Sequence, residues 1–343
     1  MACSCDAIWG ACLLELLSTG AERLAIFLWH FAVTRDTPQL LAVLAALMLF
    51  EAVLLGWKPS SLGRLCAGSP SALADMRWFF LTHAGLIAAL VYPVNLLAVA
   101  WFVPASREPF SLVWLFGPAG RILDYPVYWI LFELAAYFVH RAAHNIPFLW
   151  AFHRVHHSAT EFTVATTSRV HFGEVIFQTV MFGAFAGIVG LKPAEAALLW
   201  CLRTMLGYAN HSNLDWDYGW LGRWLLVSPR AHALHHSTSA AASNANFGNV
   251  LIVWDRVFGT WRGGAEAGAK LGLRDNPYNT GVFMDDLMLP FREICARRTG
   301  ADQAADGRAY GEPDIARSKI HASDGNPTAL SFPAIVPPGQ RSF

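Results

Sequence analysis

Long apolar runs are the feature of this sequence that most restricts its fold. A helix that crosses about 30 Å of hydrocarbon needs roughly 20 mostly apolar residues, because every backbone polar group must be paired inside the segment. Hydrophobic residues make up 55% of the chain and charged residues 15%, against about 45 to 50% and about 25% in soluble proteins. We therefore expect an all-α integral membrane bundle of about four transmembrane helices with a cytosolic histidine-rich helical cap. The apolar runs are 40–57, 78–103, 122–139, 175–191 and 194–209.

Two of these runs form a pair. Residues 175–191 and 194–209 are separated only by Lys192 and Pro193. Such a short connection predicts a tight helical hairpin, which enters the membrane and returns to the same side.

Two other runs carry signals of a break or a start. The run 78–103 is longer than one span requires and contains polar residues and a proline, so it is either one tilted span or a broken helix. The run 122–139 opens near Asp124 and Pro126, which are residues typical of a helix start.

Composition along the chain predicts four parts. An apolar stretch at 8–33 carries three charges, which indicates a marginal or interfacial helix, and it lacks the basic start and cleavage site of a signal peptide. After Trp261 the chain becomes richer in Gly, Ala, Asp and Pro, which predicts a partly disordered tail. The expected parts are 1–39, the marginal segment; 40–121, the N-terminal spans; 122–261, the histidine-rich domain; and 262–343, the polar tail.

The charge balance and the cysteines exclude several classes of protein. Lys plus Arg and Asp plus Glu both number 25, so no net field attracts nucleic acid. The six cysteines are scattered and do not form a disulfide framework. Basic residues in the loops accumulate on the side that carries most of the histidines, which predicts that this side faces the cytoplasm.

Histidine spacing is the second informative feature. Ten of the 13 histidines fall between residues 140 and 236. His140 and His144 stand four residues apart, so both project from one helix face. Two triplets repeat an i, i+3, i+4 pattern, and Ser228 and Pro229 precede the second triplet as a helix cap and first helical residue. The triplets are His153, His156 and His157, and His232, His235 and His236.

Two single histidines flank the expected hairpin. His171 precedes the outgoing helix and His211 follows the returning helix. Because a hairpin returns to its starting side, both must lie on the same side as the pair and the triplets. All ten histidines can therefore converge.

Convergent imidazoles indicate a metal site, since imidazole is a common ligand of Fe, Zn, Cu and Ni. Ten ligands are too many for one ion, so we expect two. Glu174, one turn from His171, has three roles open to it: to complete the ligand set or hold a water, to orient a ligand histidine, or to be a solvated residue at a helix start. The other acids near the histidines are Glu133, Glu161, Asp215, Asp217 and Asp255.

Together these motifs resemble the fatty acid hydroxylase superfamily, which includes sterol desaturases and sterol methyl oxidases. The resemblance covers about 124–261 and leaves out the N-terminal spans and the tail. It rests on six segments: His140–His144, His153–His157, Arg169–His171 with Glu174, His211–Asn213, Ser228–His236 and Asn246–Thr260.

The resemblance implies a non-haem di-iron centre, with two Fe ions that activate O2 to hydroxylate, desaturate or cleave a lipid chain. It implies Glu174 as a candidate catalytic residue. The run 254–260 offers no ligand type except Asp255, so we interpret it as packing around the site. Carried over by position, the metal ligands are His140, His144, His153, His156, His157, His171, His211, His232, His235 and His236.

The expected reaction also needs electrons from outside the chain. The sequence has no dinucleotide-binding glycine motif, no haem-attachment motif and no clustered cysteines for iron and sulfur. We therefore expect a separate donor, which the resemblance identifies as a ferredoxin or cytochrome b5 type protein with its reductase. Arg141, Arg154 and Arg230 are candidates either for its docking surface or for a solvated rim. Aromatic candidates for a lipid cavity, or for ordinary core, are Phe132, Tyr137, Phe138, Trp150, Phe152 and Phe172.

Lipid hydroxylation is the function that these features favour, with desaturation by the same centre as the alternative. A membrane zinc hydrolase is disfavoured because the sequence has no His-Glu-x-x-His motif. A metal transporter is disfavoured because the ligands stand at the ends of the apolar runs rather than inside them. The sequence leaves open the lipid (fatty acyl, sterol or polar membrane lipid), the regiochemistry and the oligomeric state.

Overall fold

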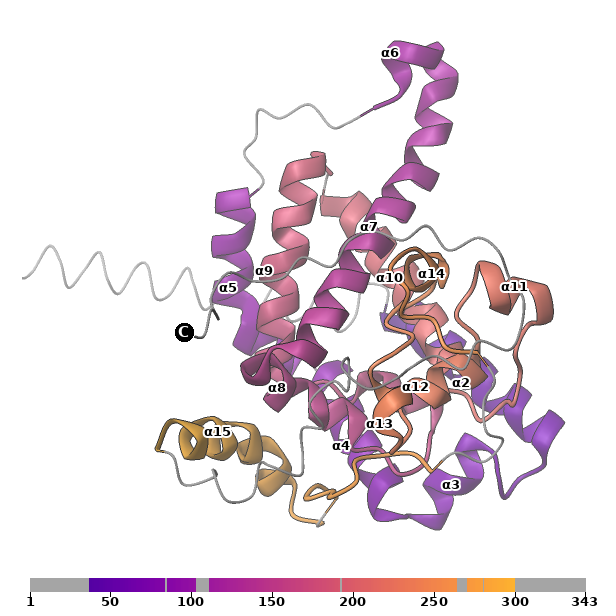
Figure 1. Ribbon diagram of the computed structural model, residues 1–343, viewed down its shortest axis with the longest axis vertical. Coiled ribbons are helices and arrows are strands. Elements are labelled where there is room, and N and C mark those ends of the chain that lie inside the picture. The colour runs from indigo at the N-terminus through magenta and orange to yellow at the C-terminus, as the bar shows by residue number, and fades with distance from the viewer. Residues whose placement is uncertain are drawn as a thin grey trace, which may run out of the picture. The chain divides into compact units, whose positions relative to one another are not determined.

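The computed structural model describes residues 37–83, 85–102, 111–191, 193–263, 270–279 and 281–299. The expected helix at 8–33 and the end of the expected tail, 300–343, lie outside these residues. Within the described ranges every regular element is a helix, and the two β-bridges are isolated (Figure 1). The all-α fold class is thus confirmed.

The N-terminal part folds as α2 (Thr37–Leu55), α3 (Ser61–Ala67), α4 (Pro70–His83) and α5 (Leu86–Phe102). The run 78–103 is a broken helix rather than one tilted span. Gly85, between α4 and α5, has a φ of 81°, a left-handed conformation that glycine adopts without the steric penalty of a Cβ. Buried side chains of α2 and α4 form one core cluster with Tyr208 of a later helix.

A long helix follows the short elements α6 (Val113–Phe116) and η2 (Gly117–Ala119). This helix, α7, spans Gly120–Asn145, so it begins before the expected start near Asp124 and Pro126. Asp124 instead accepts hydrogen bonds from the Leu112 backbone N–H at 2.6 Å and the Ser111 hydroxyl at 2.7 Å. The carboxylate therefore fixes the chain that precedes α7, and Pro126 lies inside the helix.

The expected hairpin is present as α9 (Phe172–Val189) and α10 (Pro193–Asn210). Gly190 ends α9 with a φ of 78°. Residues of α7, α9 and α10 share a buried apolar cluster that includes Phe132 and Leu199, and Figure 1 shows α5, α9 and α7 side by side. Among the described residues, Ile122–Asn145 and Phe172–Val189 are long and apolar enough to cross a membrane.

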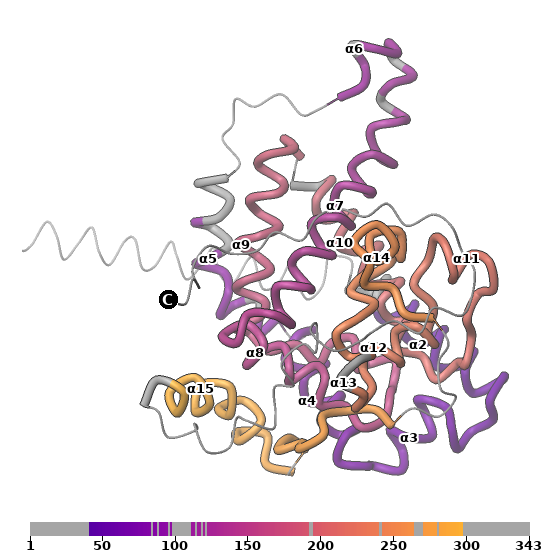
Figure 2. The backbone as a smooth tube through the Cα atoms, viewed as in Figure 1, coloured from indigo at the N-terminus to yellow at the C-terminus, as the bar shows by residue number. Residues whose placement is uncertain are grey.

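The remaining helices are short. Helix α8 packs against the C-terminal end of α7, and α12 packs against α10 and α13 (Figure 2). Helix α15 packs against α8, although it lies within the segment 262–343 that was expected to be a polar tail. The elements are α8 (Pro147–His157), η3 (Val164–Ser168), α11 (Gly219–Trp224), α12 (Pro229–His235), α13 (Ala240–Ser243), α14 (Val253–Val257) and α15 (Phe283–Thr299).

A buried ion pair connects α4 to the segment before α9. Arg169 donates from Nε to Asp75 at 2.7 Å, and both side chains are at most 1% exposed. Asp75 also accepts the hydroxyls of Thr163 at 2.8 Å and Thr166 at 2.7 Å. A buried pair of this kind fixes the two segments, because removal of either partner leaves an uncompensated charge.

Candidate metal centre

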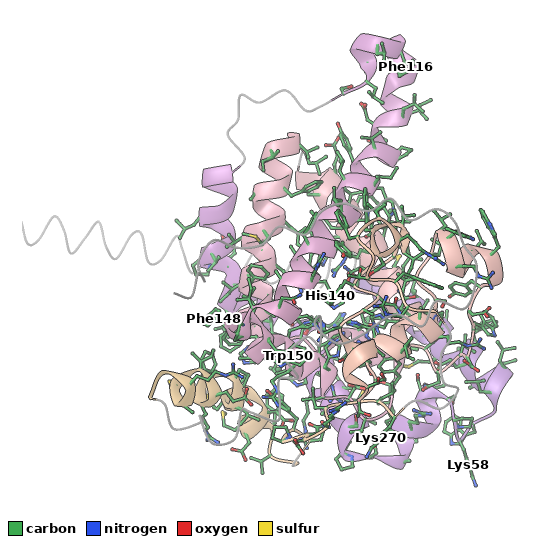
Figure 3. The ribbon with its side chains drawn as sticks, in the orientation of Figure 1. Lys58, Phe116, His140, Phe148, Trp150 and Lys270 are labelled. Carbon is green, nitrogen blue, oxygen red and sulfur yellow. The ribbon has the colours of Figure 1, made fainter. Side chains whose placement is uncertain are left out.

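Nine of the ten histidines singled out from the sequence come together in two adjacent clusters. In each cluster the candidate ligand atoms all lie within 4.8 Å of one another. Every one of these side chains is at most 8% exposed, and in Figure 3 His140 lies in the interior of the molecule. The five-histidine cluster contains His140, His144, His153, His157 and His235; the four-histidine cluster contains His156, His211, His232 and His236.

The helical triplets are what place the two clusters side by side. In α8 the first and last histidines of the triplet join the five-histidine cluster and the middle one joins the other cluster. In α12 the division is reversed, since only the middle histidine, His235, joins the five-histidine cluster. Ser228 caps α12 by accepting from the Ala231 N–H at 3.2 Å, with Pro229 as first helical residue, as the sequence predicted.

Hydrogen bonds assign the tautomers in the five-histidine cluster. His140 donates from Nδ1 to the Phe247 carbonyl at 2.8 Å, and His235 donates from Nδ1 to the Ala245 carbonyl at 2.7 Å. A carbonyl only accepts, so in a neutral ring each Nε2 carries a lone pair. These two Nε2 atoms lie 3.1 Å apart. Two facing lone pairs repel each other unless a cation binds them both.

Ring nitrogens without a hydrogen-bond partner also indicate that a cation binds in the five-histidine cluster. The Nε2 atoms of His144, His153 and His157 are buried without a hydrogen-bond partner in the described protein. A buried polar atom of this kind costs about 1 to 3 kcal/mol if nothing binds it. The donor set therefore fits a metal ion that accepts neutral imidazoles, such as iron.

The four-histidine cluster has similar chemistry, but fewer of its imidazoles are held by hydrogen bonds to backbone carbonyls. His211 Nδ1 lies 2.9 Å from the Gly207 carbonyl, which leaves its Nε2 as an acceptor. That Nε2 lies 3.0 Å from Nε2 of His232 and 3.2 Å from Nε2 of His156. Both nitrogens of His236 are buried without a partner in the described protein. This cluster also fits a metal ion, with one fewer imidazole.

Burial favours the neutral form of six of these imidazoles, which is the form that binds a metal. Burial lowers the pKa of His211 to about 4 and that of His235 to about 3. Burial, followed by the nearby imidazoles, also lowers the pKa values of His156, His157, His232 and His236 well below the ordinary range.

Glu174 contacts the five-histidine cluster from outside. It is buried, and its Oε1 accepts a hydrogen bond from His153 Nδ1 at 2.9 Å and another from Gln178 Nε2 at 2.8 Å. Of the roles that the sequence left open, this contact corresponds to orientation of a candidate ligand histidine. The donated Nδ1 proton leaves His153 Nε2 to face the cluster.

The structure does not bring His171 into either cluster. It caps α9, where its Nδ1 accepts from the Gly173 N–H at 3.0 Å. Its Nε2 lies 3.0 Å from the Leu287 carbonyl of α15 and donates to it. Both ring nitrogens are thereby occupied, and the ring packs against Phe152 and Trp78.

The other acids near the histidines divide into two kinds. Glu133 and Asp255 are buried and bind backbone N–H groups of the segment 247–251. Glu161 contacts the Ser69 hydroxyl, while Asp215 and Asp217 pair with Arg230 at the surface.

Several contacts to the histidines had no signal in the sequence. The carbonyls of Ala245 and Phe247 belong to the main chain, so their residue types do not reveal them. The ring of Phe162 packs against His211, His232 and His236, with centroids 5.1, 6.2 and 5.0 Å away. Of the aromatic candidates, Trp150 packs on His144 and His157, whereas Phe132 lies in the core between α7 and α9.

Comparison with known proteins confirms the resemblance seen in the sequence. Residues 125–260 match the family model of fatty acid hydroxylases, a range that contains both clusters. The chain is 31% identical over 132 residues to an ornithine lipid hydroxylase of Rhizobium tropici and 28% identical over 149 residues to an alkylglycerol monooxygenase of Xenopus tropicalis. It is also 28% identical over 175 residues to a fatty acid hydroxylase of a Lecanicillium species.

These similarities cover part of each protein. The matched regions are 38%, 41% and 45% of this chain and 40%, 33% and 46% of the respective relatives. The chain thus matches about a third to a half of the length of these relatives. No solved structure matches the chain.

Proposed function

We propose that the chain is a membrane-bound non-haem di-iron monooxygenase that hydroxylates a lipid, using O2 and external electrons. The observation that carries this proposal is the pair of adjacent, buried histidine clusters. In the five-histidine cluster the facing Nε2 lone pairs of His140 and His235 repel each other unless a cation binds them both. The relatives support the reaction class, since each is named as a hydroxylase or a monooxygenase.

In this proposal each cluster holds one iron ion. When bound, the two ions supply the O2 activation that breaking an unactivated C–H bond requires, because no side chain is a strong enough oxidant. The chain's own residues bind and orient them. Glu174 and the carbonyls of Ala245 and Phe247 hold three imidazoles by their outer N–H groups. Trp150 and Phe162 pack over histidines of the two clusters and limit the access of water.

A membrane lipid is the proposed substrate. His140 and His144 of the five-histidine cluster lie in the last turns of α7, a helix that is apolar enough to cross a membrane. A lipid chain that lies beside α7 is therefore close to the proposed metal ions. The names of the relatives mention ornithine lipid, alkylglycerol and fatty acid, which share long apolar chains. Hydroxylation is preferred to desaturation because all three relatives are named for oxygen insertion. A bundle of about four spans, with the histidines facing the cytoplasm, completes this proposal.

A separate protein supplies the electrons. Two of the arginines considered for its docking are engaged within the chain: Arg154 pairs with Glu293 at 2.6 Å, and Arg230 pairs with Asp215 at 2.6 Å. Their positive charge is therefore locally neutralised. This favours a role in the fold over a dedicated docking patch at these two positions.

Comparison of lipid extracts tests the proposed reaction. Cells that express the wild-type chain should accumulate one lipid class with a mass gain of one oxygen, and cells that express His156→Ala should not. An unchanged lipid profile with the wild-type chain would refute the proposal. A loss of two hydrogens would replace hydroxylase with desaturase.

A further inference from the structure

Two carbonyls of the segment Ala245–Thr260 accept hydrogen bonds from histidines of the five-histidine cluster; we name this segment the carbonyl segment. We propose that the carbonyl segment, fixed by Asp255, is the device that positions His140 and His235 for metal binding. This inference rests on the proposed function and adds a role for Asp255 and the run 254–260, which the sequence indicated only as packing.

The planar peptide unit explains how Asp255 acts at a distance. The peptide between Phe247 and Gly248 presents its C=O to His140 and its N–H to Asp255 Oδ2, at 2.8 and 2.7 Å. In a trans peptide these two groups point in opposite directions within one plane. Fixing the N–H on the carboxylate therefore fixes the direction of the carbonyl, and with it the tilt of the His140 ring.

The second peptide is held in the same way. The unit between Ala245 and Asn246 presents its C=O to His235 at 2.7 Å, and its N–H donates to the Thr260 carbonyl at 3.0 Å. The Thr260 hydroxyl in turn donates to Asp255 Oδ1 at 2.7 Å. Both histidine-binding peptides thus connect to one carboxylate.

Local residue choice agrees with this role. Asn246 has a φ of 56°, a left-handed conformation that asparagine tolerates better than most residues. A Cβ at Gly248 would lie 2.5 Å from the Leu251 carbonyl oxygen and 2.8 Å from Asp255 Oδ2. Only glycine lets the backbone approach the carboxylate this closely.

Glu133 ties the carbonyl segment to the helix that carries His140. Its Oε2 accepts the N–H groups of Val250 at 2.8 Å and Leu251 at 3.1 Å. Glu133 lies seven residues before His140, two turns along α7. The ligand histidine and the carbonyl that orients it therefore share one support.

A positioning role and a merely structural role predict different losses of metal. Asp255→Asn exchanges one acceptor oxygen for a donor NH2 group, which cannot accept the Phe247 or Gly248 N–H. If Asp255 positions the two histidines, only the five-histidine cluster should weaken. If it simply stabilises the fold, both clusters should weaken together.

The experiment measures anaerobic Fe²⁺ binding to the full chain in detergent, with each cluster isolated in turn. His232→Ala/His236→Ala removes the four-histidine cluster, and His144→Ala/His157→Ala removes the other. Asp255→Asn should weaken Fe²⁺ binding about 10- to 100-fold in the first background, as loss of a ligand's hydrogen-bonded support does, and should leave it unchanged in the second. Equal weakening in both backgrounds, or in neither, would overturn the inference.

Two further variants complete the test, one as a control and one as a milder change at the same carboxylate. Asp286→Asn is the matched control, because Asp286 is also buried and accepts a backbone N–H, from Asn279 at 3.1 Å, but the described residues of that loop make no hydrogen bond to a histidine of either cluster. It should leave Fe²⁺ binding unchanged in both backgrounds. Thr260→Val removes one donor to Asp255 and should shift binding in the same direction as Asp255→Asn by a smaller factor, which covers the case that Asp255→Asn does not fold. A wild-type chain that binds no Fe²⁺ would overturn the proposed function itself, whereas wild-type binding of two ions with unaffected variants would overturn only this inference.

Discussion

Removing the carboxylate of Glu174 should weaken one metal site and leave the other intact. The structure gives Glu174 one contact with the clusters, the hydrogen bond from His153 Nδ1 at 2.9 Å. His153 belongs to the five-histidine cluster, and its Nε2 is buried without a partner in the described protein. The effect of a substitution should therefore pass through His153 alone.

The magnitude follows from the type of hydrogen bond that is lost. Bonds to charged groups contribute about 1.5 to 3 kcal/mol and neutral ones about 0.5 to 1.5. Glu174→Gln keeps an acceptor oxygen but loses the charge, so it should cost about 1 kcal/mol, or about 5-fold in Fe²⁺ affinity. Glu174→Ala leaves the His153 N–H buried and unpaired, which costs about 1 to 3 kcal/mol, or about 5- to 150-fold.

The assay is Fe²⁺ titration of the full chain in detergent, in a His232→Ala/His236→Ala background that retains only the five-histidine cluster. Glu293→Ala is the matched control, since Glu293 also binds a residue of α8, Arg154, which is not a ligand. Unchanged Fe²⁺ affinity in Glu174→Ala would refute the reasoning. If lipid oxidation were then lost with both metals still bound, Glu174 would take part in the chemistry instead of orienting a ligand.

Three further predictions follow from the same geometry. If each cluster holds one iron ion as proposed, His171→Ala should retain both ions but increase amide hydrogen exchange in α15, because it removes the hydrogen bond to Leu287; loss of one iron would show that His171 is a ligand. The metal-free chain should lose stability as pH falls from about 6.5 toward 4. Burial lowers the pKa of His211 to about 4 and that of His235 to about 3, whereas histidines of the unfolded chain titrate at about 6.5, so the unfolded chain takes up protons that the folded chain does not. A melting temperature in detergent that is equal or higher at pH 5 than at pH 7.5 would contradict this prediction. Arg169→Met should destabilise the chain by about 3 to 5 kcal/mol, because it leaves Asp75 buried without its counter-charge; an unchanged melting temperature would count against that estimate.

Sequence periodicity predicted the helices and the convergence of histidines because both depend on local geometry. The i, i+3, i+4 spacing in α8 and α12 puts each triplet on one helix face, and a short turn returns α10 to the side where α9 began. The spacing of histidines within one helix does not reveal which histidines of the neighbouring helices they meet. The division of each triplet between two clusters depends on how α7, α8 and α12 pack.

The features that the sequence did not predict depend on main-chain hydrogen bonds and on contacts between segments that are distant in the sequence. His171 stands in the same kind of position as His211, at one end of the hairpin, yet its nitrogens are occupied by Gly173 and Leu287. Leu287 belongs to α15, more than a hundred residues later, in a segment whose composition indicated a tail. The carbonyls that orient His140 and His235 belong to the main chain, which is the same in every residue, so the amino-acid sequence does not indicate their role. The start of α7 was placed too late because Asp124 caps the preceding segment rather than its own helix.

The origin of the inserted oxygen distinguishes a monooxygenase from the other candidate functions. Membranes that contain the wild-type chain, an electron donor and the lipid identified from cell extracts should be supplied with ¹⁸O2 in ordinary water. The product should contain one ¹⁸O atom, and it should be formed by the wild-type chain and not by His156→Ala. A product whose new oxygen comes from water, or one formed equally well without O2, would contradict the proposed function.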